Sequence, residues 1–348
     1  MRRTLAIALA CTLFCGILSA QTPRFFPDTI ILERFVFDPA QDMLPYPSGF
    51  DVSWVNYDMD GQPTFEGTPG NWFWDSEINR DSGATDNYGM MSVSWLLNPA
   101  AHNYNWLILP LLDIPDSAYM LYWRSAPFQG PAYMDGYKVL VSEEGNIPES
   151  GDFANILFEA ASTLSTNYAC ANLDPLNLDC YTFTDGYVHA DGFTKTEYFE
   201  TRFNADIGVY LHYGFLEPHA VSLAAFANKL IYVAFLHDAF DCNILQIDDI
   251  VVARKVGIAT GDPKSGIAGF SVAPTVAEES AYLEWALRNR EEVRLQVSDL
   301  QGRIVTERRY SGETSGLLHL SLSDFSPGVY LVSLQTGSGL ATCKLIKR

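Results

Sequence analysis

The chain has 348 residues, a formal net charge of −20 and 13% aromatic residues. Gly and Pro are frequent and helical periodicity is scarce, which favours an all-β protein. From Phe270 onward nine acidic residues balance nine basic ones, so residues 21–269 carry 33 acidic against 11 basic residues. A region that acidic repels polyanions, which argues against nucleic acid as a partner.

The N-terminus has the features of a secretory signal. Arg2 and Arg3 precede an apolar stretch over residues 5–18, and Ser19-Ala20 supplies a small-residue cleavage site. The same stretch is short for a membrane anchor, so we expect a signal peptide over 1–20 and a mature chain from Gln21. No later apolar run approaches the roughly 18 residues of a membrane span, so no transmembrane segment is predicted.

Four cysteines remain once this signal is removed. Export makes a disulfide possible, and the close spacing of Cys170 and Cys180 in a loop-like stretch makes them the expected pair. Cys242 and Cys343 lie in different expected domains and are predicted to be free. The four do not have the spacing of a zinc site.

Strand-like segments then follow in chain order at 119–125, 137–142, 229–238 and 245–252. Several are apolar on both faces, as in the interior of a sandwich, and others alternate with a period of two. A Gly-, Pro- and Ser-rich stretch over 257–272 is the expected domain linker. Beyond it, alternation resumes, so residues 273–348 are predicted to form a small antiparallel sandwich of their own.

Three segments at the end of the chain occur in a recognisable order: VRLQVSDLQGRIV (293–305), LSDFSPGVYLVSL (322–334) and CKLIKR (343–348). They resemble the type A C-terminal sorting domain of the type IX secretion system, an Ig-like fold. The resemblance implies a Bacteroidetes-like source, recognition by the type IX machinery, and export to the outer-membrane surface or the medium. The residues that carry it are Asp299, Gly302, Gly328, Tyr330, Lys344 and Lys347.

Residues 50–252 carry a second resemblance, in segments such as FDVSWVNYDMDGQ (50–62), YKVLVSE (137–143) and LQIDDIVV (245–252). They are similar to the choice-of-anchor J, or cleaved adhesin, domain, which implies a jelly-roll β-sandwich of the MAM or galactose-binding type over residues 21–256. The resemblance implies a surface-displayed, non-catalytic adhesin whose ligand is a host or matrix protein or a glycan. A carbohydrate-binding module and a structural surface or biofilm component are the alternatives.

A calcium site is suggested by Asn56, Asp58, Asp60 and Gly61, which alternate oxygen ligands ahead of a glycine turn. The loop lacks the bidentate Glu of an EF-hand at its twelfth position, which is Gly67. The resemblance adds Asp248 and Asp249 as partners. The competing interpretation is an acidic loop that is simply solvated.

Aromatic residues suggest two further binding sites. Trp72 and Trp74 lie in a loop where exposed rings could stack on sugars, whereas Trp95, Trp106 and Trp123 lie in or beside apolar strands and are expected in the core. The segment between Ser162 and Leu216 is long for the family, and long insertions often bind ligands. Its candidate ligand-binding residues are Tyr181 and Tyr187, and the alternative is a decorative hairpin.

No nucleophile elbow, zinc-protease helix, P-loop or dinucleotide fingerprint is present. The nearest catalytic constellation is His237-Asp238, which could meet Asp248-Asp249 in space. We therefore expect no enzyme activity.

Overall fold

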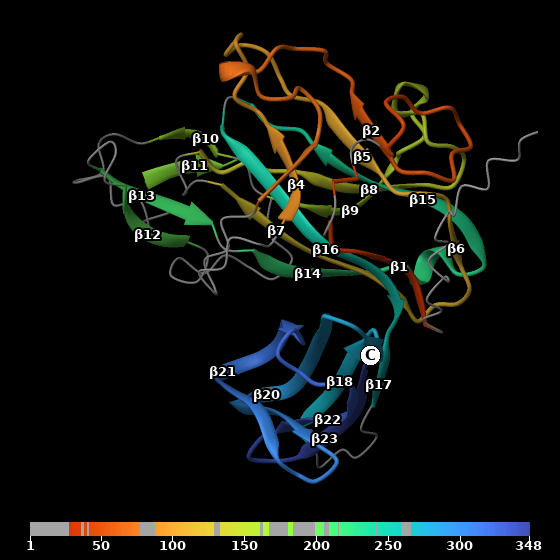
Figure 1. The fold of residues 1–348 in the computed structure, drawn as a ribbon, viewed down its shortest axis with the longest axis vertical. Helices are drawn as coiled ribbons and strands as arrows, with labels where there is room; N and C mark the ends of the chain where they lie inside the picture. The colour runs from red at the N-terminus through yellow and green to blue at the C-terminus, as the bar shows by residue number, and fades with distance from the viewer. Residues whose placement is uncertain are drawn as a thin grey trace, which may run out of the picture.

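The computed structural model describes residues 28–35, 38–39, 42–76, 88–128, 133–160, 163–166, 180–183, 199–204, 209–214, 216–240, 242–258 and 266–348. These residues form an N-terminal two-sheet sandwich and a smaller C-terminal domain, which is blue and lies below it in Figure 1. The all-β prediction is confirmed. The described residues contain no helix that is both long and apolar enough to cross a membrane.

The N-terminal sandwich consists of two six-stranded sheets. The first has the order β14-β7-β16-β4-β3 with β1 added on β16, and the second has the order β2-β5-β15-β8-β9 with β6 added on β15. The strands of the first sheet are β1 (Thr29–Glu33), β3 (Phe73–Ser76), β4 (Tyr88–Val93), β7 (Tyr119–Pro127), β14 (Glu217–Ser222) and β16 (Ile244–Arg254). Those of the second are β2 (Val55–Asp58), β5 (Asn105–Ile108), β6 (Leu112–Ile114), β8 (Lys138–Ser142), β9 (Asn155–Glu159) and β15 (Lys229–His237).

Strand β15 shows why the central strands are apolar on both faces. Ile231, Val233 and Phe235 face the main core between the sheets, where Trp123 also packs. The alternate residues, Tyr232 among them, belong to a second cluster with Trp106 and Phe153. Both sides of the strand are therefore covered, as expected for a strand with no solvent face.

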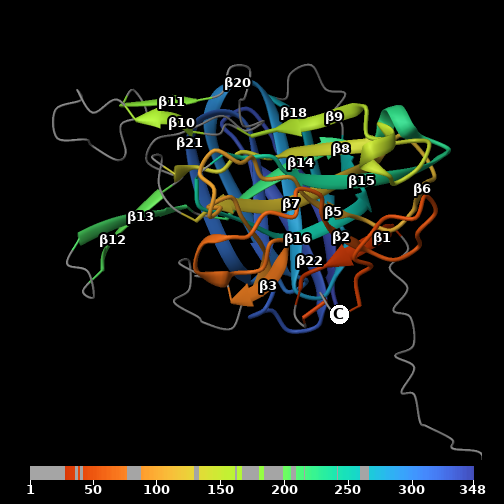
Figure 2. The same ribbon diagram turned by 90° about the horizontal axis from the view of Figure 1, so that it is seen from above.

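The described residues of this half also contain short 3-10 turns and two hairpins. The turns are η1 (Phe65–Gly67), η3 (Pro148–Ser150) and η5 (Ala224–Phe226). The hairpins are β10 (Thr163–Thr166) with β11 (Tyr181–Phe183), and β12 (Phe199–Asn204) with β13 (Val209–Gly214). Both hairpins belong to the long 162–216 segment, and Figures 1 and 2 show them projecting to one side of the sandwich.

The C-terminal domain is a seven-stranded sheet that folds over itself, with the order β17-β18-β20-β22-β23-β19 and β21 added on β20. Its strands are β17 (Val256–Ile258), β18 (Ile267–Ala273), β19 (Val276–Ala277), β20 (Ser280–Asp299), β21 (Ile304–Ser321), β22 (Gly328–Gln335) and β23 (Leu340–Lys347). Strands β20 and β21 are long because they contribute to both layers, and their pairing shifts register between Ala286 and Glu291.

The described residues within the expected linker over 257–272 are mostly in strands. Residues 256–258 and 267–273 pair with each other as β17 and β18, and β18 pairs with β20. Ile267, Phe270 and Val272 are buried in the core of the C-terminal domain. Glycine content favours a flexible connector, but the apolar residues at alternate or near-alternate positions make residues 267–273 a strand.

Candidate functional site

Two loops extend the β2–β5 pair beyond the end of the sheet. Strand pairing ends at Asp58 opposite Asn105, but Met59 N donates to Tyr104 O at 3.1 Å. Farther out, Leu97 N donates to Pro63 O and Phe65 N to Trp95 O, each at 2.9 Å. Residues 59–65 and 95–104 therefore run side by side as a ribbon at the end of the sandwich opposite the C-terminal domain, at the top of Figure 1.

This ribbon carries exposed apolar side chains. Phe65 and Trp95 stack with ring centroids 4.3 Å apart, and His102 stacks on Tyr104 at 4.7 Å. Phe240 comes from the turn between β15 and β16, and its ring centroid lies 6.1 Å from that of His102. The six apolar members are 38–57% exposed, and together they form what we call the distal aromatic surface: Met59, Phe65, Trp95, Leu97, Tyr104 and Phe240.

The tryptophan predictions are partly reversed. Trp72 is fully buried and its indole N–H donates to Asn105 O at 3.1 Å, so it is a core residue. Trp74 is half-buried, stacks on Tyr88 at 4.1 Å and donates to Phe35 O. Trp95, expected in the core, is 43% exposed. The segment 72–76 continues into edge strand β3, which turns its rings inward, whereas Trp95 lies beyond the end of β4.

Trp106 and Trp123 are buried, as expected from their place in apolar strands. Another group of exposed apolar residues precedes β2: Tyr46, Phe50 and Val52. Tyr46 packs beside Tyr57, whereas Phe50 and Val52 flank Asp51, whose carbonyl accepts from Leu111 N at the opposite end of the β2–β5 pair.

The N-x-D-x-D-G motif forms the base of the ribbon. Asp58 accepts from Gly61 N at 2.7 Å, and Asp60 accepts from Gln62 N at 2.8 Å and from Tyr104 N at 2.6 Å. Burial raises the pKa of the Asp58 carboxyl, and the neighbouring Asp60 carboxylate adds to the effect. These carboxylates accordingly hold the turn and tie the two loops together.

The other predicted calcium ligands are not assembled around this motif. The Asn56 amide is buried and exchanges two hydrogen bonds with the backbone of Trp72. Asp248 and Asp249 lie on β16, in the other sheet. Within the described ranges, no group of three or more His, Cys, Asp or Glu side chains is arranged to hold a metal ion. Calcium binding at Asp58 and Asp60 stays a prediction.

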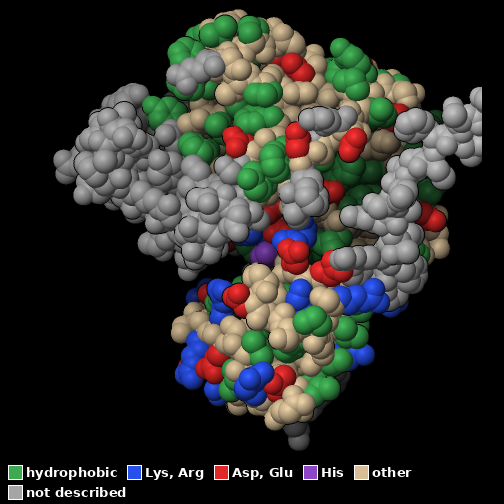
Figure 3. Space-filling model, viewed as in Figure 1, with side chains coloured by type: hydrophobic (Ala, Val, Ile, Leu, Met, Phe, Trp, Pro, Cys, Tyr) green, Lys and Arg blue, Asp and Glu red, His purple; other side chains and the backbone are tan. Residues whose placement is uncertain are grey.

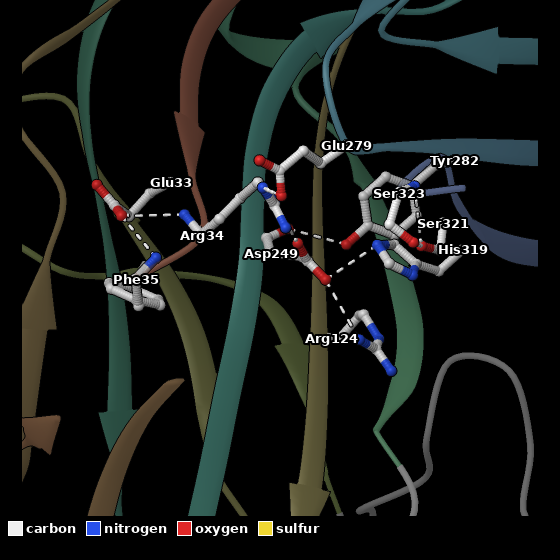
Figure 4. A network of polar contacts seen from close by, with 10 residues as sticks. All are labelled: Glu33, Arg34, Phe35, Arg124, Asp249, Glu279, Tyr282, His319, Ser321 and Ser323. Atoms are coloured by element: carbon white, nitrogen blue, oxygen red, sulfur yellow. Dashed lines mark hydrogen bonds and ion pairs between the residues drawn. The ribbon is translucent and has the colours of Figure 1, made fainter. Parts of the chain in front are cut away.

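Asp249 instead lies at the junction between the two domains, shown in Figure 4. Its carboxylate is 3.4 Å from Arg34 Nε and 3.3 Å from Arg124 Nη1 in the N-terminal sandwich, and 2.9 Å from His319 Nε2 on β21. The two guanidinium groups and the imidazole hold the pKa of this buried carboxyl well below its usual range, against the opposing effect of burial. The Asp249 carboxylate, predicted as a calcium ligand, is therefore paired with cationic side chains of the protein.

The residues predicted in the long insertion are mostly outside the described ranges. Tyr187 and Cys170 lie there, whereas Tyr181 is 8% exposed and therefore not a surface ligand-binding residue. Cys180 is disulfide-bonded, and the described thiols of Cys242 and Cys343 are not in a disulfide.

The sorting-motif residues converge at one end of the C-terminal sheet. Asp299 pairs with Tyr330 across β20 and β22, and Gly328 pairs with Lys347 across β22 and β23, where Lys344 is exposed. Asp299 accepts from Gln301 N and Arg303 N, which closes the turn where Gly302 adopts φ 81°. Glycine is needed there because a positive φ is costly for other residues.

A Ser-His-Asp arrangement is present inside the sandwich. His237 Nδ1 lies 2.7 Å from Ser92 Oγ, and His237 Nε2 lies 3.1 Å from Asp135 Oδ1. All three side chains are at most 2% exposed, and Asn105 also donates to Ser92 Oγ. A nucleophile must reach its substrate, so this buried network connects β4 and β15 as a structural element. Asp238 pairs separately with Lys138 and His102, so the predicted constellation with Asp248 and Asp249 does not form.

Comparison with known proteins agrees with both sequence resemblances. Solved structures similar to the chain include the K3 and K1 cleaved adhesin domains of Lys-gingipain from Porphyromonas gingivalis W83. K3 is 20% identical, covers 65% of this chain and 98% of its own, and has a TM-score of 0.35. K1 is 19% identical, covers 61% and 96%, and has a TM-score of 0.34. No curated protein sequence matches.

Two family models each match a part of the chain. A sorting domain of the type IX kind implies export to the cell surface or the extracellular space. Residues 48–176 match the Cleaved Adhesin Domain family, and residues 272–348 match the Secretion system C-terminal sorting domain family.

Proposed function

We propose that this protein is a non-catalytic, surface-displayed adhesin-type protein that binds its ligand through the distal aromatic surface. The carrying observation is the position of that surface: it lies at the end of the sandwich farthest from the C-terminal domain that directs export. A ligand can approach this end without contacting the C-terminal domain. Two adjacent loops and the turn between β15 and β16 supply the rings, and loops held by a rigid sheet are common binding elements.

The chemistry of the surface suits a binding role. Aromatic side chains dominate the energetics of protein interfaces and also provide flat faces for sugar rings. Asp60 fixes the two loops relative to each other through its bond to Tyr104 N, so the rings are presented with little loss of conformational freedom on binding. The strongly acidic N-terminal region disfavours anionic ligands such as sulfated glycans or nucleic acid.

The test is an array of matrix proteins and glycans probed with the purified full chain. Trp95→Ala should lower the affinity for any specific hit at least about tenfold, as expected for a central aromatic contact. Phe50→Ala is the matched control, because Phe50 is 78% exposed at the opposite end of the same strand pair. Equal loss in both variants, or no loss in Trp95→Ala, contradicts binding at this surface.

The same array separates the alternatives. Specific binding of the wild-type chain to a matrix protein supports adhesion. Specific binding to a glycan supports the carbohydrate-binding alternative. Self-association of the protein, with no binding to a matrix protein or a glycan, supports a structural surface component. If Trp95→Ala abolishes this self-association, the distal aromatic surface is where the copies meet.

A further inference from the structure

We propose that the ion cluster around Asp249 is a latch that holds the C-terminal domain against the N-terminal sandwich at neutral pH and releases it in mild acid. The latch is made by groups from both domains. Asp249, Arg34 and Arg124 come from the N-terminal sandwich, whereas His319 comes from β21. Figure 4 shows the His319 ring directed at the Asp249 carboxylate.

Other contacts across the junction are also polar. Arg34 pairs with Glu279, Lys255 Nζ lies 2.7 Å from Glu284 Oε2, and the Tyr282 hydroxyl donates to Asp249 O at 2.8 Å. Charged side chains of both signs gather at this boundary in Figure 3. The orientation of the two domains therefore depends on charge matching, as in interfaces that open and close.

The apolar part of the junction is small. Tyr122, Val251 and Ala253 meet Ala273 and Tyr282, with a few partly buried neighbours. Beside this contact lies a cleft of about 580 Å³, lined by residues of both domains that include Met120, Lys255, Phe270, Glu284 and Trp285. Because the apolar contact is small and borders this cleft, weakening of the ionic contacts is expected to separate the domains.

The shape of β16 prepares Asp249 for this role. Asp249 has φ 50°, and the pairing of β16 with β7 shifts register between Asp248 and Val251. A left-handed conformation is costly for a residue other than glycine and persists where the surroundings impose it. The bulge places the Asp249 carboxylate at the junction while Ile247 and Ile250 both face the main core.

His319 supplies the pH dependence. It faces Asp249, Arg34 and Arg124 from the N-terminal sandwich and Tyr282 from its own domain. Glu279 and Asp248 act on this group through Arg34. Burial and the repulsion from the two arginines lower the pKa of His319, and they outweigh the attraction of Asp249. The docked state therefore binds fewer protons at His319 than the separated state does.

The sign follows from this difference. At pH values above 6.5, the ordinary pKa of a histidine, His319 is neutral in both the docked and the separated state. Protonation then does not weaken docking. Below this pH, the separated state takes up a proton that the docked state does not. The docking constant should then fall by up to about tenfold for each pH unit, the limit for one proton.

Single-molecule energy transfer in the full chain measures this directly. Ile156→Cys and Leu300→Cys carry the two dyes, because both positions are exposed and lie in different domains. Cys11, Cys15, Cys242 and Cys343 are replaced by Ser so that only these two positions are labelled. The ratio of separated to docked molecules should rise between pH 7.5 and 5.0, and reverse on return to neutral pH. In His319→Gln the ratio should be independent of pH.

Asp249→Asn provides a second, independent measure, because it leaves Arg34 and Arg124 without their shared carboxylate. It should raise the separated fraction already at pH 7.5. A docked population that is unchanged at pH 5.0 overturns the proposal, and so does a His319→Gln variant that retains the wild-type pH response. Domains that stay docked in Asp249→Asn overturn the role of the ion cluster.

Discussion

Tyr122 and Tyr282, from different domains, stack face to face with ring centroids 4.9 Å apart and planes inclined by 18°. Both rings are buried, and burial raises the pKa of each phenol far above its usual range. Both hydroxyls therefore remain protonated, and Tyr282 donates its proton to Asp249 O. This stack gives the junction its main apolar contact.

Changes at Tyr282 should separate the hydrogen bond from the ring contact. Tyr282→Phe keeps the stack but leaves the Asp249 carbonyl without this donor, and should cost about 1–3 kcal/mol of unfolding free energy. Tyr282→Ala also removes the ring and should cost about 3–5 kcal/mol. Urea unfolding of the full chain measures both. Equal costs for the two variants contradict a contribution from the stack.

Replacement of Trp72 and of Trp95, whose burial is the reverse of the sequence prediction, should change the free energy of unfolding by different amounts. Trp72→Ala creates a cavity in the core and should cost about 3–5 kcal/mol. Trp95→Ala removes a ring that is 43% exposed and should cost about 1–2 kcal/mol, in keeping with the smaller area buried. Thermal and urea unfolding of the full chain checks this order. A larger cost for Trp95→Ala shows that its ring is structural.

Calcium can be tested by thermal unfolding of the full chain in millimolar calcium and in EDTA. If Asp58 and Asp60 bind the ion, calcium should raise Tm, because a ligand bound only to the native state stabilises it. The expected shift is about 2–4 °C per kcal/mol of binding free energy. Asp58→Asn should abolish the shift. An unchanged Tm in the wild type removes calcium from this site.

Gly316 should be intolerant of a side chain. It lies opposite Trp285 in the β20–β21 pair, and a Cβ at this position would meet the indole ring at 1.9 Å. Gly316→Ala should therefore destabilise the C-terminal domain by about 1–3 kcal/mol through overpacking. Gly269→Ala is the matched control in β18, because nothing lies within 4 Å of its Cβ. Equal stability of the two variants contradicts this packing.

The fold class and the C-terminal sorting domain were predictable from sequence patterns alone. Alternating and doubly apolar segments predicted strands because side chains in a strand point to opposite faces, and β15 confirms this in detail. The sorting motif was visible because its residues are turn and strand-pairing positions close together in the chain, such as Asp299 and Gly302. Local rules of this kind need no knowledge of distant neighbours.

The tertiary structure alone decided which aromatic rings are exposed and what the acidic residues contact. The sequence indicates a loop at Trp72 and an apolar strand beside Trp95, but the direction in which β3 and the 95–104 loop leave the sheets buries Trp72 and exposes Trp95. The segment LQIDDIVV (245–252) does contain a sequence signal for the bulge. Residues 245 and 247 face the main core, and so do residues 250 and 252, so the alternation of period two shifts by one residue at Asp248-Asp249. That shift marks the bulge, but its partners Arg34, Arg124 and His319 come from segments far apart in the chain. No sequence pattern could bring them together, because their meeting depends on how the two domains pack.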